Sequence, residues 1–355
     1  MAGLGGSDGT RVLVTGGAGY IGSHTVWQLI EGGYRVVVLD NLYSGHRWAV
    51  HPLAELVIGD AGDIPLVRSL LRERGIESVV HFAGHIVVPE SVRDPLKYYH
   101  NNTAVSRNLM AASVAEGVTD FVFSSSAAVY GIPAKVPADE TAETNPISPY
   151  GTSKLMTEWM LRDLAAATTA AERPFRYVAL RYFNVAGARL DGRLGQATPE
   201  ATHLIKTACL VACGLRSHMD LFGTDYATPD GTCIRDYIHV EDLAAAHLLA
   251  LKYLAEGGVS QVLNCGYGKG SSVREVIDMV ERVSARNVLV HEAGRRAGDP
   301  PQLTAAAQRV RDVLGWTPRY QDLEVICRSA YEWERILQKG SGINGPYAVA
   351  GHTPP

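Results

Sequence analysis

The sequence predicts an α/β fold, with a doubly wound parallel sheet in the first half and a smaller, less regular second half. Apolar runs typical of buried parallel strands, such as residues 11–15 and 177–181, alternate with helical patterns. The 355 residues, 46% of them hydrophobic, are enough for a large core. Beyond Phe183 the loops lengthen and the strands lose their regularity. These observations predict two unequal parts.

We expect the first domain to span residues 11–183, with later segments returning to it. Residues 184–338 are then mainly a second domain, which covers the carboxyl edge of the sheet. Residues 1–10 and 340–355 are rich in glycine or proline and are predicted to be flexible tails.

The first strand runs into a glycine turn, Gly16-x-x-Gly19-x-x-Gly22, followed by a helical pattern over residues 21–30. Strand, turn and helix N-terminus form a phosphate cradle, although the first gap is one residue longer than in the common fingerprint. Asp40 ends the second strand, residues 35–39, eighteen residues after Gly22. An acid there can accept a hydrogen bond from a ribose hydroxyl and would repel a 2′-phosphate, which favours NAD over NADP. The predicted domain is therefore Rossmann-like.

The alternation continues to the end of the first half. Asp60 follows the third strand and is predicted either to meet an adenine or to cap a helix, while Asp63 is the more natural cap. Further strands are expected at 56–59, 78–81, 120–123 and 177–181, and helices from 64 onward and over 95–116, 150–170, 241–254 and 273–283.

Tyr150 and Lys154 are the sharpest chemical signal, because their spacing places both on one helix face. A phenol has a pKa near 10, and a nearby ammonium favours its ionised form, so the pair suits proton transfer. Ser126 could share a hydrogen bond with the reacting oxygen. Ser124 and Ser125 remain alternatives to Ser126, and a Tyr–Lys pair is also common on plain helix surfaces.

Composition excludes several classes of function. The net charge of −4 gives no basic surface for nucleic acid. The five cysteines are scattered without metal spacing, which indicates a reducing compartment, and we expect no metal site. Without an apolar segment of spanning length or a signal-peptide pattern, we predict a cytoplasmic protein that does not contact membranes.

Eight motifs together resemble the UDP-glucose 4-epimerase family, within the extended short-chain dehydrogenases/reductases. They are TGGAGYIGSH at 15–24, DNL at 40–42, HFAG at 81–84, YYHNN at 98–102, SSSAAVYG at 124–131, YGTSK at 150–154, RYFN at 181–184 and RDYIHV at 235–240. The resemblance runs from about residue 11 to residue 337.

This resemblance implies 4-epimerisation of a UDP-hexose, UDP-glucose or UDP-galactose. Tyr150 takes the proton of the 4-hydroxyl while C4 gives a hydride to NAD⁺, the 4-keto sugar rotates, and the hydride returns to the other face. The implied catalytic residues are Ser126, Tyr150 and Lys154.

The implied binding residues form two sets. Those facing NAD are Gly16, Gly19, Tyr20, Ile21, Gly22, Asp40, Asn41, Asp60, Ala61, Phe82, Ala83, Asn101, Tyr150, Lys154 and Tyr182. Those facing the UDP-sugar are Ser126, Tyr150, Phe183, Asn184, Leu204, Phe222, Arg235, Arg296 and Asp299. The arginines suit a diphosphate, because guanidinium groups match phosphate oxygens.

Three positions depart from the family pattern. Ile86 stands where many relatives carry a lysine near the cofactor, and His203 replaces an amide beside the sugar. Leu303 aligns where a large aromatic side chain often narrows the sugar pocket, so N-acetylated sugars remain open as substrates.

Other interpretations remain. Alanines at 127 and 128 argue against a dehydratase or decarboxylase, which needs an acid there. An epimerase for UDP-xylose/UDP-arabinose or a UDP-N-acetylhexosamine, and a non-catalytic NAD(P)-sensing regulator, are alternatives. The family resemblance also implies a homodimer formed by the helices within 95–116 and 150–170.

Overall fold

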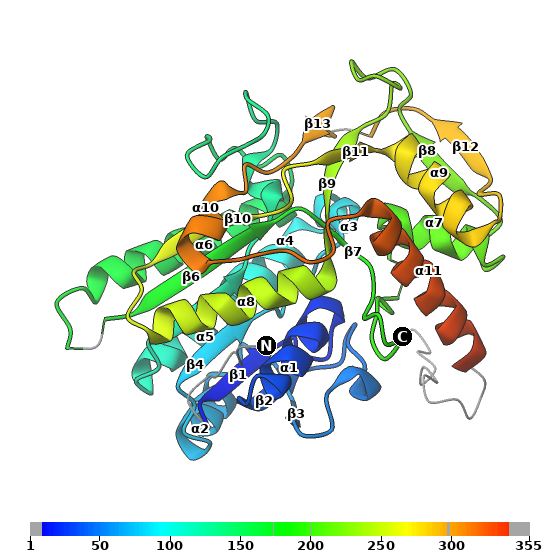
Figure 1. Ribbon diagram of the computed structural model, residues 1–355. Coiled ribbons are helices and arrows are strands. Elements are labelled where there is room, and N and C mark those ends of the chain that lie inside the picture. The colour runs from blue at the N-terminus through cyan, green and yellow to red at the C-terminus, as the bar shows by residue number, and fades with distance from the viewer. Residues whose placement is uncertain (1–8, 173, 200, 297–298, 341–355) are drawn as a thin grey trace.

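A computed structural model describes residues 9–172, 174–199, 201–296 and 299–340 (Figure 1). Within them, seven parallel strands form the central sheet in the order β10-β6-β5-β4-β1-β2-β3. This arrangement confirms the predicted doubly wound fold. The strands are β1 (Arg11–Thr15), β2 (Arg35–Asp40), β3 (Glu55–Ile58), β4 (Ser78–His81), β5 (Asp120–Ser124), β6 (Arg176–Tyr182) and β10 (Gln261–Cys265).

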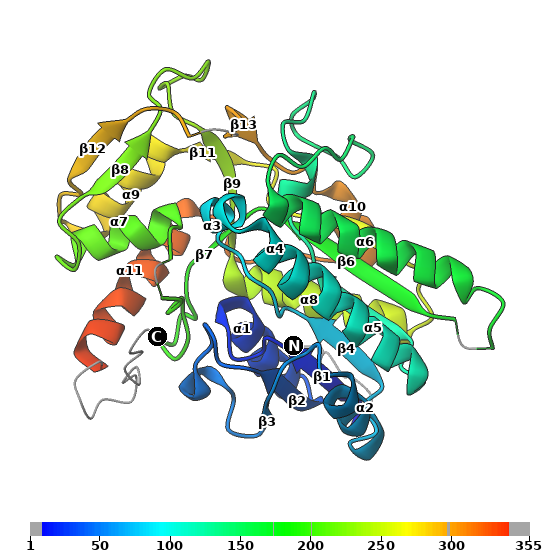
Figure 2. The ribbon, with the colours of Figure 1, turned by 180° about the vertical axis from the view of Figure 1, so that it is seen from behind.

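The sheet is buried on both faces, which explains its continuous apolar strands. In β1, Val12 and Val14 point into one core and Leu13 into the other, because strand side chains alternate. Helices α1 (Tyr20–Glu31), α8 (Val240–Ala255) and α10 (Gln308–Leu314) cover the first face. Helices α2 (Ile64–Glu73), α5 (Val105–Ala115) and α6 (Pro149–Ala167) cover the second, which faces the viewer in Figure 2.

Local signals predicted most of these helices to within a few residues. Asp63 caps α2 as expected, since its carboxylate accepts a hydrogen bond from the Leu66 N–H at 3.0 Å. The helix expected over 95–116 is interrupted, however. It consists of α4 (Pro95–Tyr98), a π-helical segment at Tyr99–Ala104, and then α5. The short α3 (Val88–Arg93) was not predicted.

The second half forms a smaller layer beside the carboxyl edge of the sheet. Strand β9 (Ile234–His239) pairs with β7 (Asn184–Ala186), β11 (Gly270–Ser272) and β13 (Gln302–Leu303). A parallel two-stranded ribbon joins β8 (Met219–Phe222) to β12 (Val290–Ala293). Helices α7 (Leu204–Ala212), α9 (Val273–Ser284) and α11 (Leu323–Gly340) pack on one another beside them (Figure 1).

The chain passes between the two parts more than once. It leaves the large sheet after β6, returns from β9 through α8 to β10, and leaves again for β11. Helix α8 packs against α1 at the centre of the large sheet. No helix in the described ranges combines the length and the hydropathy needed to cross a membrane.

Candidate active site

The glycine turn between β1 and α1 lies against the turn that follows β4. Gly16 has a φ of +70°, and a Cβ there would lie 2.6 Å from the Ala83 nitrogen. Gly19 precedes α1, and none of the side chains that the structure describes caps this helix. Tyr20, Ile21 and Gly22 form its first turn. The N–H groups at this end of α1 are therefore available to an anionic ligand.

Asp40 ends β2 beside this turn and is largely buried. One carboxylate oxygen accepts the Ala18 N–H at 2.9 Å, and the other accepts the Leu42 N–H at 2.8 Å. Burial raises the pKa of this carboxyl, while the two hydrogen bonds oppose the rise. Asp40 thus connects the glycine turn to the residues that follow β2, and its carboxyl lies at the carboxyl edge of the sheet.

The neighbouring strand end carries the other predicted adenosine-side residues. Asp60 lies exposed just beyond β3 and accepts the Gly62 N–H at 2.7 Å, whereas Ala61 is buried. Asn41 follows Asp40 and accepts the Tyr43 N–H at 3.0 Å. Because β2 and β3 are parallel neighbours, these residues meet at one edge of the sheet.

The π-helical segment positions the turn after β4. Asn102 is buried, accepts the His85 N–H at 2.8 Å, and donates to the His85 carbonyl at 3.0 Å and to the Ser153 hydroxyl at 3.0 Å. Asn101 donates to the Asn102 side chain at 3.3 Å. Sequence reasoning selected Asn101 and missed Asn102, although two asparagines inside a predicted helix are a signal because asparagine is a poor helix former.

Tyr150 lies in the first turn of α6, close to Ser126. Ser148 caps the helix by accepting the Gly151 N–H at 3.2 Å. A Cβ on Gly151 would lie 2.5 Å from the Ala128 carbonyl oxygen, so this glycine lets α6 approach the 3₁₀ turn that Ser126 begins. Burial raises the pKa of Tyr150, and a hydrogen bond with the Ser126 hydroxyl opposes that rise.

Lys154 lies one helical turn beyond Tyr150 and is almost completely buried. Its ammonium donates to the Ser124 carbonyl at 2.9 Å and lies 5.1 Å from the centre of the Phe123 ring. Burial lowers the pKa of Lys154 to about 8. The ammonium form therefore still predominates at neutral pH.

The structure separates the three serines that the sequence left open. The Ser124 hydroxyl bonds the Tyr182 hydroxyl, and Ser125 donates to Glu158. Ser126 accepts the Ala128 N–H at 3.2 Å, and its hydroxyl is the one that lowers the pKa of Tyr150. The three serines are consecutive in the chain but have different partners, so the sequence alone could not distinguish them.

Beneath the serines lies a buried ion pair that sequence reasoning did not identify. The Arg181 guanidinium contacts the Glu158 carboxylate at 2.6 Å and also donates to the Tyr130 hydroxyl at 3.0 Å. Glu158 comes from α6 and Arg181 from β6. The pair therefore joins the helix that carries Tyr150 to the sheet.

Four residues predicted to face UDP come together although they lie on separate segments. The Arg296 guanidinium stacks 4.8 Å above the Phe222 ring, and its Nε lies 2.8 Å from one Asp299 oxygen. The other Asp299 oxygen lies 3.6 Å from the Arg235 guanidinium. Arg235 is largely covered, with 12% of its side chain exposed, whereas 47% of Arg296 is exposed. Asp299 thus lies between two arginines.

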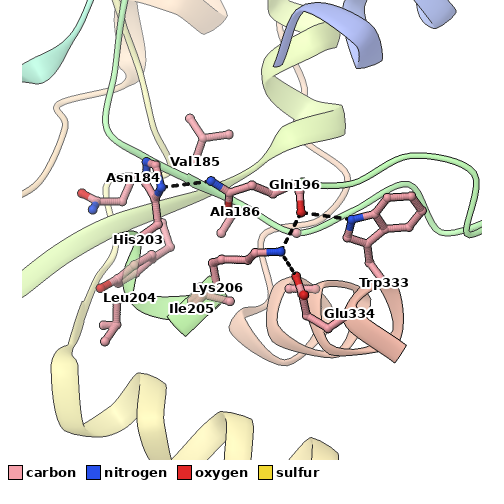
Figure 3. A pocket seen from close by; sticks show the side chains of 13 residues that line it. Asn184, Val185, Ala186, Gln196, His203, Leu204, Ile205, Lys206, Trp333 and Glu334 are labelled. Atoms are coloured by element: carbon pink, nitrogen blue, oxygen red, sulfur yellow. Dashed lines mark hydrogen bonds and ion pairs between the residues drawn. The ribbon is translucent and has the colours of Figure 1, made fainter. Parts of the chain in front are cut away.

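Asn184 and Leu204 line a pocket where β7, α7 and α11 meet (Figure 3). The Nδ1 of His203 lies 2.9 Å from the Nε2 of Gln196. Lys206 donates to the Gln196 carbonyl at 2.9 Å and forms a buried ion pair with Glu334. His203 is therefore fixed against the pocket wall. The preceding Phe183 is buried in the core of the large sheet.

Together, the doubly wound sheet, the glycine turn with Asp40 beyond it, and the grouping of Ser126, Tyr150 and Lys154 are typical of a nucleotide-dependent α/β enzyme. A model of the NAD-dependent epimerase/dehydratase family matches residues 12–266. The chain belongs to this family.

Known proteins resemble the chain over nearly its whole length. The UDP-glucose 4-epimerase of Azospirillum brasilense is 56% identical over 335 residues, covering 94% of this chain and 95% of the relative. The UDP-glucose 4-epimerase of Brucella ovis, crystallised with NAD, has a TM-score of 0.87 at 45% identity and covers 91% and 98% of the two chains. The UDP-Glc/GlcNAc 4-epimerase of Campylobacter jejuni has a TM-score of 0.80 at 46% identity, with 92% and 99% covered.

Proposed function

We propose that this protein is an NAD-dependent 4-epimerase that interconverts UDP-glucose and UDP-galactose. The observation that carries the proposal is the buried Tyr150 at the start of α6, which packs on the turn that Ser126 begins, with Lys154 one helical turn later. These three residues come after the glycine turn in the chain. In the second half, the Arg235–Asp299–Arg296 cluster supplies cationic side chains. The high identity to UDP-glucose 4-epimerases over almost the full chain supports the same reaction.

The residues around the glycine turn fit NAD. The absence of a side chain on Gly16 lets the glycine turn pack directly on the backbone of Ala83, and α1 starts without a side-chain cap that would compete with a phosphate for its N–H groups. Asp40 offers an acceptor to a ribose hydroxyl and would repel an added phosphate. When bound, the nicotinamide would accept a hydride from C4 of the sugar and later return it. Phe82, Tyr182, Asn101 and Lys154 are proposed to contact the same cofactor.

Tyr150 acts in this proposal as the base for the sugar 4-hydroxyl. Burial alone holds its pKa above the working range, so the phenolate needs a compensating charge. Lys154 supplies one, since its own pKa of about 8 leaves it cationic at pH 7. Ser126 keeps the phenol oriented and can share the proton that moves. The same phenol then returns the proton when the epimer forms.

The arginine cluster would hold the diphosphate while the oxidised sugar turns over. Arg235 and Arg296 can each present a planar guanidinium to phosphate oxygens, and Asp299 orients both. Phe222, lying beneath Arg296, adds a flat apolar surface. Phe183, Asn184 and Leu204 are proposed to border the sugar.

N-acetylated UDP-hexoses are the second candidate substrate. Leu303 pairs with Arg235 in the parallel register of β13 and β9, next to the proposed diphosphate site. A leucine occupies less space than the aromatic residue often found there, which favours a wider pocket. The relative from Campylobacter jejuni bears both sugars in its name.

The test is to incubate the purified protein separately with UDP-galactose, UDP-N-acetylgalactosamine and UDP-xylose, without added NAD, and to identify the products. We expect UDP-glucose from UDP-galactose, with NAD released when the protein is denatured. If bound NAD is present and none of the three sugars gives an epimer, the protein is not an epimerase. A C4 epimer of the acetylated sugar would extend the substrate range.

We also propose a cytoplasmic homodimer. The side chains of Leu96 on α4 and Trp159 on α6 are 76% and 45% exposed, on the helices through which the family resemblance implies dimerisation. The five cysteines lie within the described residues as free thiols, in keeping with a reducing compartment. Light scattering with size-exclusion chromatography should give twice the mass of the chain, and Trp159→Glu should give the monomer mass.

A further inference from the structure

The β8–β12 ribbon carries three potential metal ligands on its outer face. They are His218, Asp220 and His291, and their ligand atoms all lie within 4.8 Å of one another. None of the three is among the residues assigned to the candidate active site, although Phe222 lies two residues beyond Asp220 on the same strand. The ribbon is labelled at the edge of the smaller layer in Figure 1.

The backbone of the ribbon brings these side chains together. Met219 and Leu221 are buried, so the alternating residues His218 and Asp220 point to the opposite, outer face. The parallel register then places His291 directly opposite Asp220. Main-chain pairing thus holds Asp220 and His291 on adjacent strands, and His218 immediately precedes the first paired residue, Met219.

The two histidine rings lie against each other. Their rings stack with centroids 3.9 Å apart and an angle of 26° between the planes. The Nδ1 of His218 lies 2.9 Å from the Ser217 hydroxyl, which leaves its Nε2 for a ligand. A hydrogen bond from the second ring nitrogen is the usual way in which proteins orient a metal-binding histidine.

We infer that His218, Asp220 and His291 form a binding site for a divalent first-row transition-metal ion of the Zn²⁺ type. Two neutral imidazoles and a carboxylate suit Zn²⁺ and its neighbours, whereas Mg²⁺ and Ca²⁺ prefer oxygen ligands alone. Water completes the coordination, since the three ligands occupy an exposed face. Binding joins β8 to β12 and therefore stabilises the ribbon. The inference does not depend on the proposed enzymatic function.

The test is calorimetric titration of the untagged, chelator-treated protein with Zn²⁺. We expect one ion per chain, and at least about a tenfold loss of affinity in His291→Ala and in Asp220→Asn. The matched control is Glu292→Gln, which removes a carboxylate from the residue next to His291. In the unaltered protein the Glu292 side chain pairs with Arg274. Glu292→Gln should keep the affinity of the unaltered protein.

Two further measurements separate loss of the site from loss of the fold. UDP-sugar turnover in chelator should be the same for His291→Ala and for the unaltered protein. Added Zn²⁺ should raise the thermal midpoint of the unaltered protein but not that of the His218→Ala/His291→Ala double variant. Zn²⁺ binding with equal affinity and stoichiometry to that double variant would overturn the inference.

Discussion

The two halves of the candidate site hold their polar side chains in different ways. In the large sheet each group is fixed by the fold itself: Lys154 by the Ser124 carbonyl and Asp40 by two backbone N–H groups. In the smaller layer the charged groups hold one another, since Asp299 pairs with Arg235 and Arg296. In the proposed reaction, the first half holds its catalytic side chains in fixed positions. The second half holds charged side chains that pair with one another and would also bind the phosphates of the substrate. We expect substitutions in the first to change kcat and those in the second to change KM.

Tyr150→Phe should have the largest effect. It removes the group that accepts the proton, and general acid–base groups contribute about 10²–10⁴-fold to rate. We expect kcat for UDP-galactose to fall by that factor while bound NAD and the circular dichroism spectrum stay unchanged. Tyr253→Phe in α8 is the control and should keep full activity. Turnover within tenfold of the unaltered protein would remove Tyr150 from the mechanism.

Arg235→Gln tests the second half of the comparison. Hydrogen bonds to charged groups contribute about 1.5–3 kcal/mol, so we expect KM to rise roughly tenfold to a hundredfold with a smaller change in kcat. Arg296→Gln should do less, because its side chain is more exposed. The matched control is Arg295→Gln, because the Arg295 guanidinium pairs with Asp225 at 2.7 Å and not with Asp299. A fall in kcat at constant KM would contradict the division between the halves.

Glu241 lies where the two halves join, at the start of α8 directly after β9. Burial raises the pKa of its carboxyl to about 7, and one of its oxygens has no hydrogen-bond partner in the described part of the chain. Because the folded pKa is raised above the unfolded value, its stabilising contribution is complete below about pH 4.5 and is lost as the pH rises through 7.

Glu241→Gln should therefore stabilise the protein at pH 8, by on the order of 2 kcal/mol, and change little at pH 4.5. Urea unfolding at both pH values measures the difference. Glu256→Gln at the exposed end of the same helix is the control and should give equal shifts at both. A Glu241→Gln effect that does not vary with pH would mean that folding does not shift the pKa of this carboxyl.

Adjacent serines give the smallest and sharpest test within the first half. Ser126→Ala should lower kcat about tenfold, because it removes one hydrogen bond to Tyr150. Ser125→Ala should leave kcat unchanged and lower the free energy of unfolding by about 1–3 kcal/mol, since it removes a buried partner of Glu158. The reverse pattern would assign the hydrogen bond with the reacting oxygen to Ser125.

Signals that lie close together in the chain predicted the large sheet well. The glycine turn, the Asp63 cap and the Tyr150–Lys154 spacing each depend on a few consecutive residues, and the elements around them form where expected. The alternation of strands with helices predicted a parallel sheet, but it did not predict the order of the strands or the place of β10 in the sheet. Which residues touch cofactor and substrate stays a prediction, supported by the resemblance and by these positions.

Contacts between distant segments could not be predicted. Asp299 meets Arg235 only after β13 and β9 pair, and His291 meets Asp220 only through the register of β12 and β8. The π-helical segment contains Asn102, which donates to Ser153 in α6, and the sequence of residues 95–116 alone could not show this contact between helices. In each case the deciding partner lies far away in sequence.

The return of β10 to the large sheet has a consequence for biosynthesis. Strand β10 pairs with the outer edge of β6, yet the ribosome completes β6 at Tyr182 and begins β10 only at Gln261. During that interval β6 offers unpaired backbone groups and the apolar side chains of Val178 and Leu180, the features of an aggregation-prone edge. A nascent chain halted before Gln261 would therefore expose this edge, whereas the finished chain covers it with its own later strand.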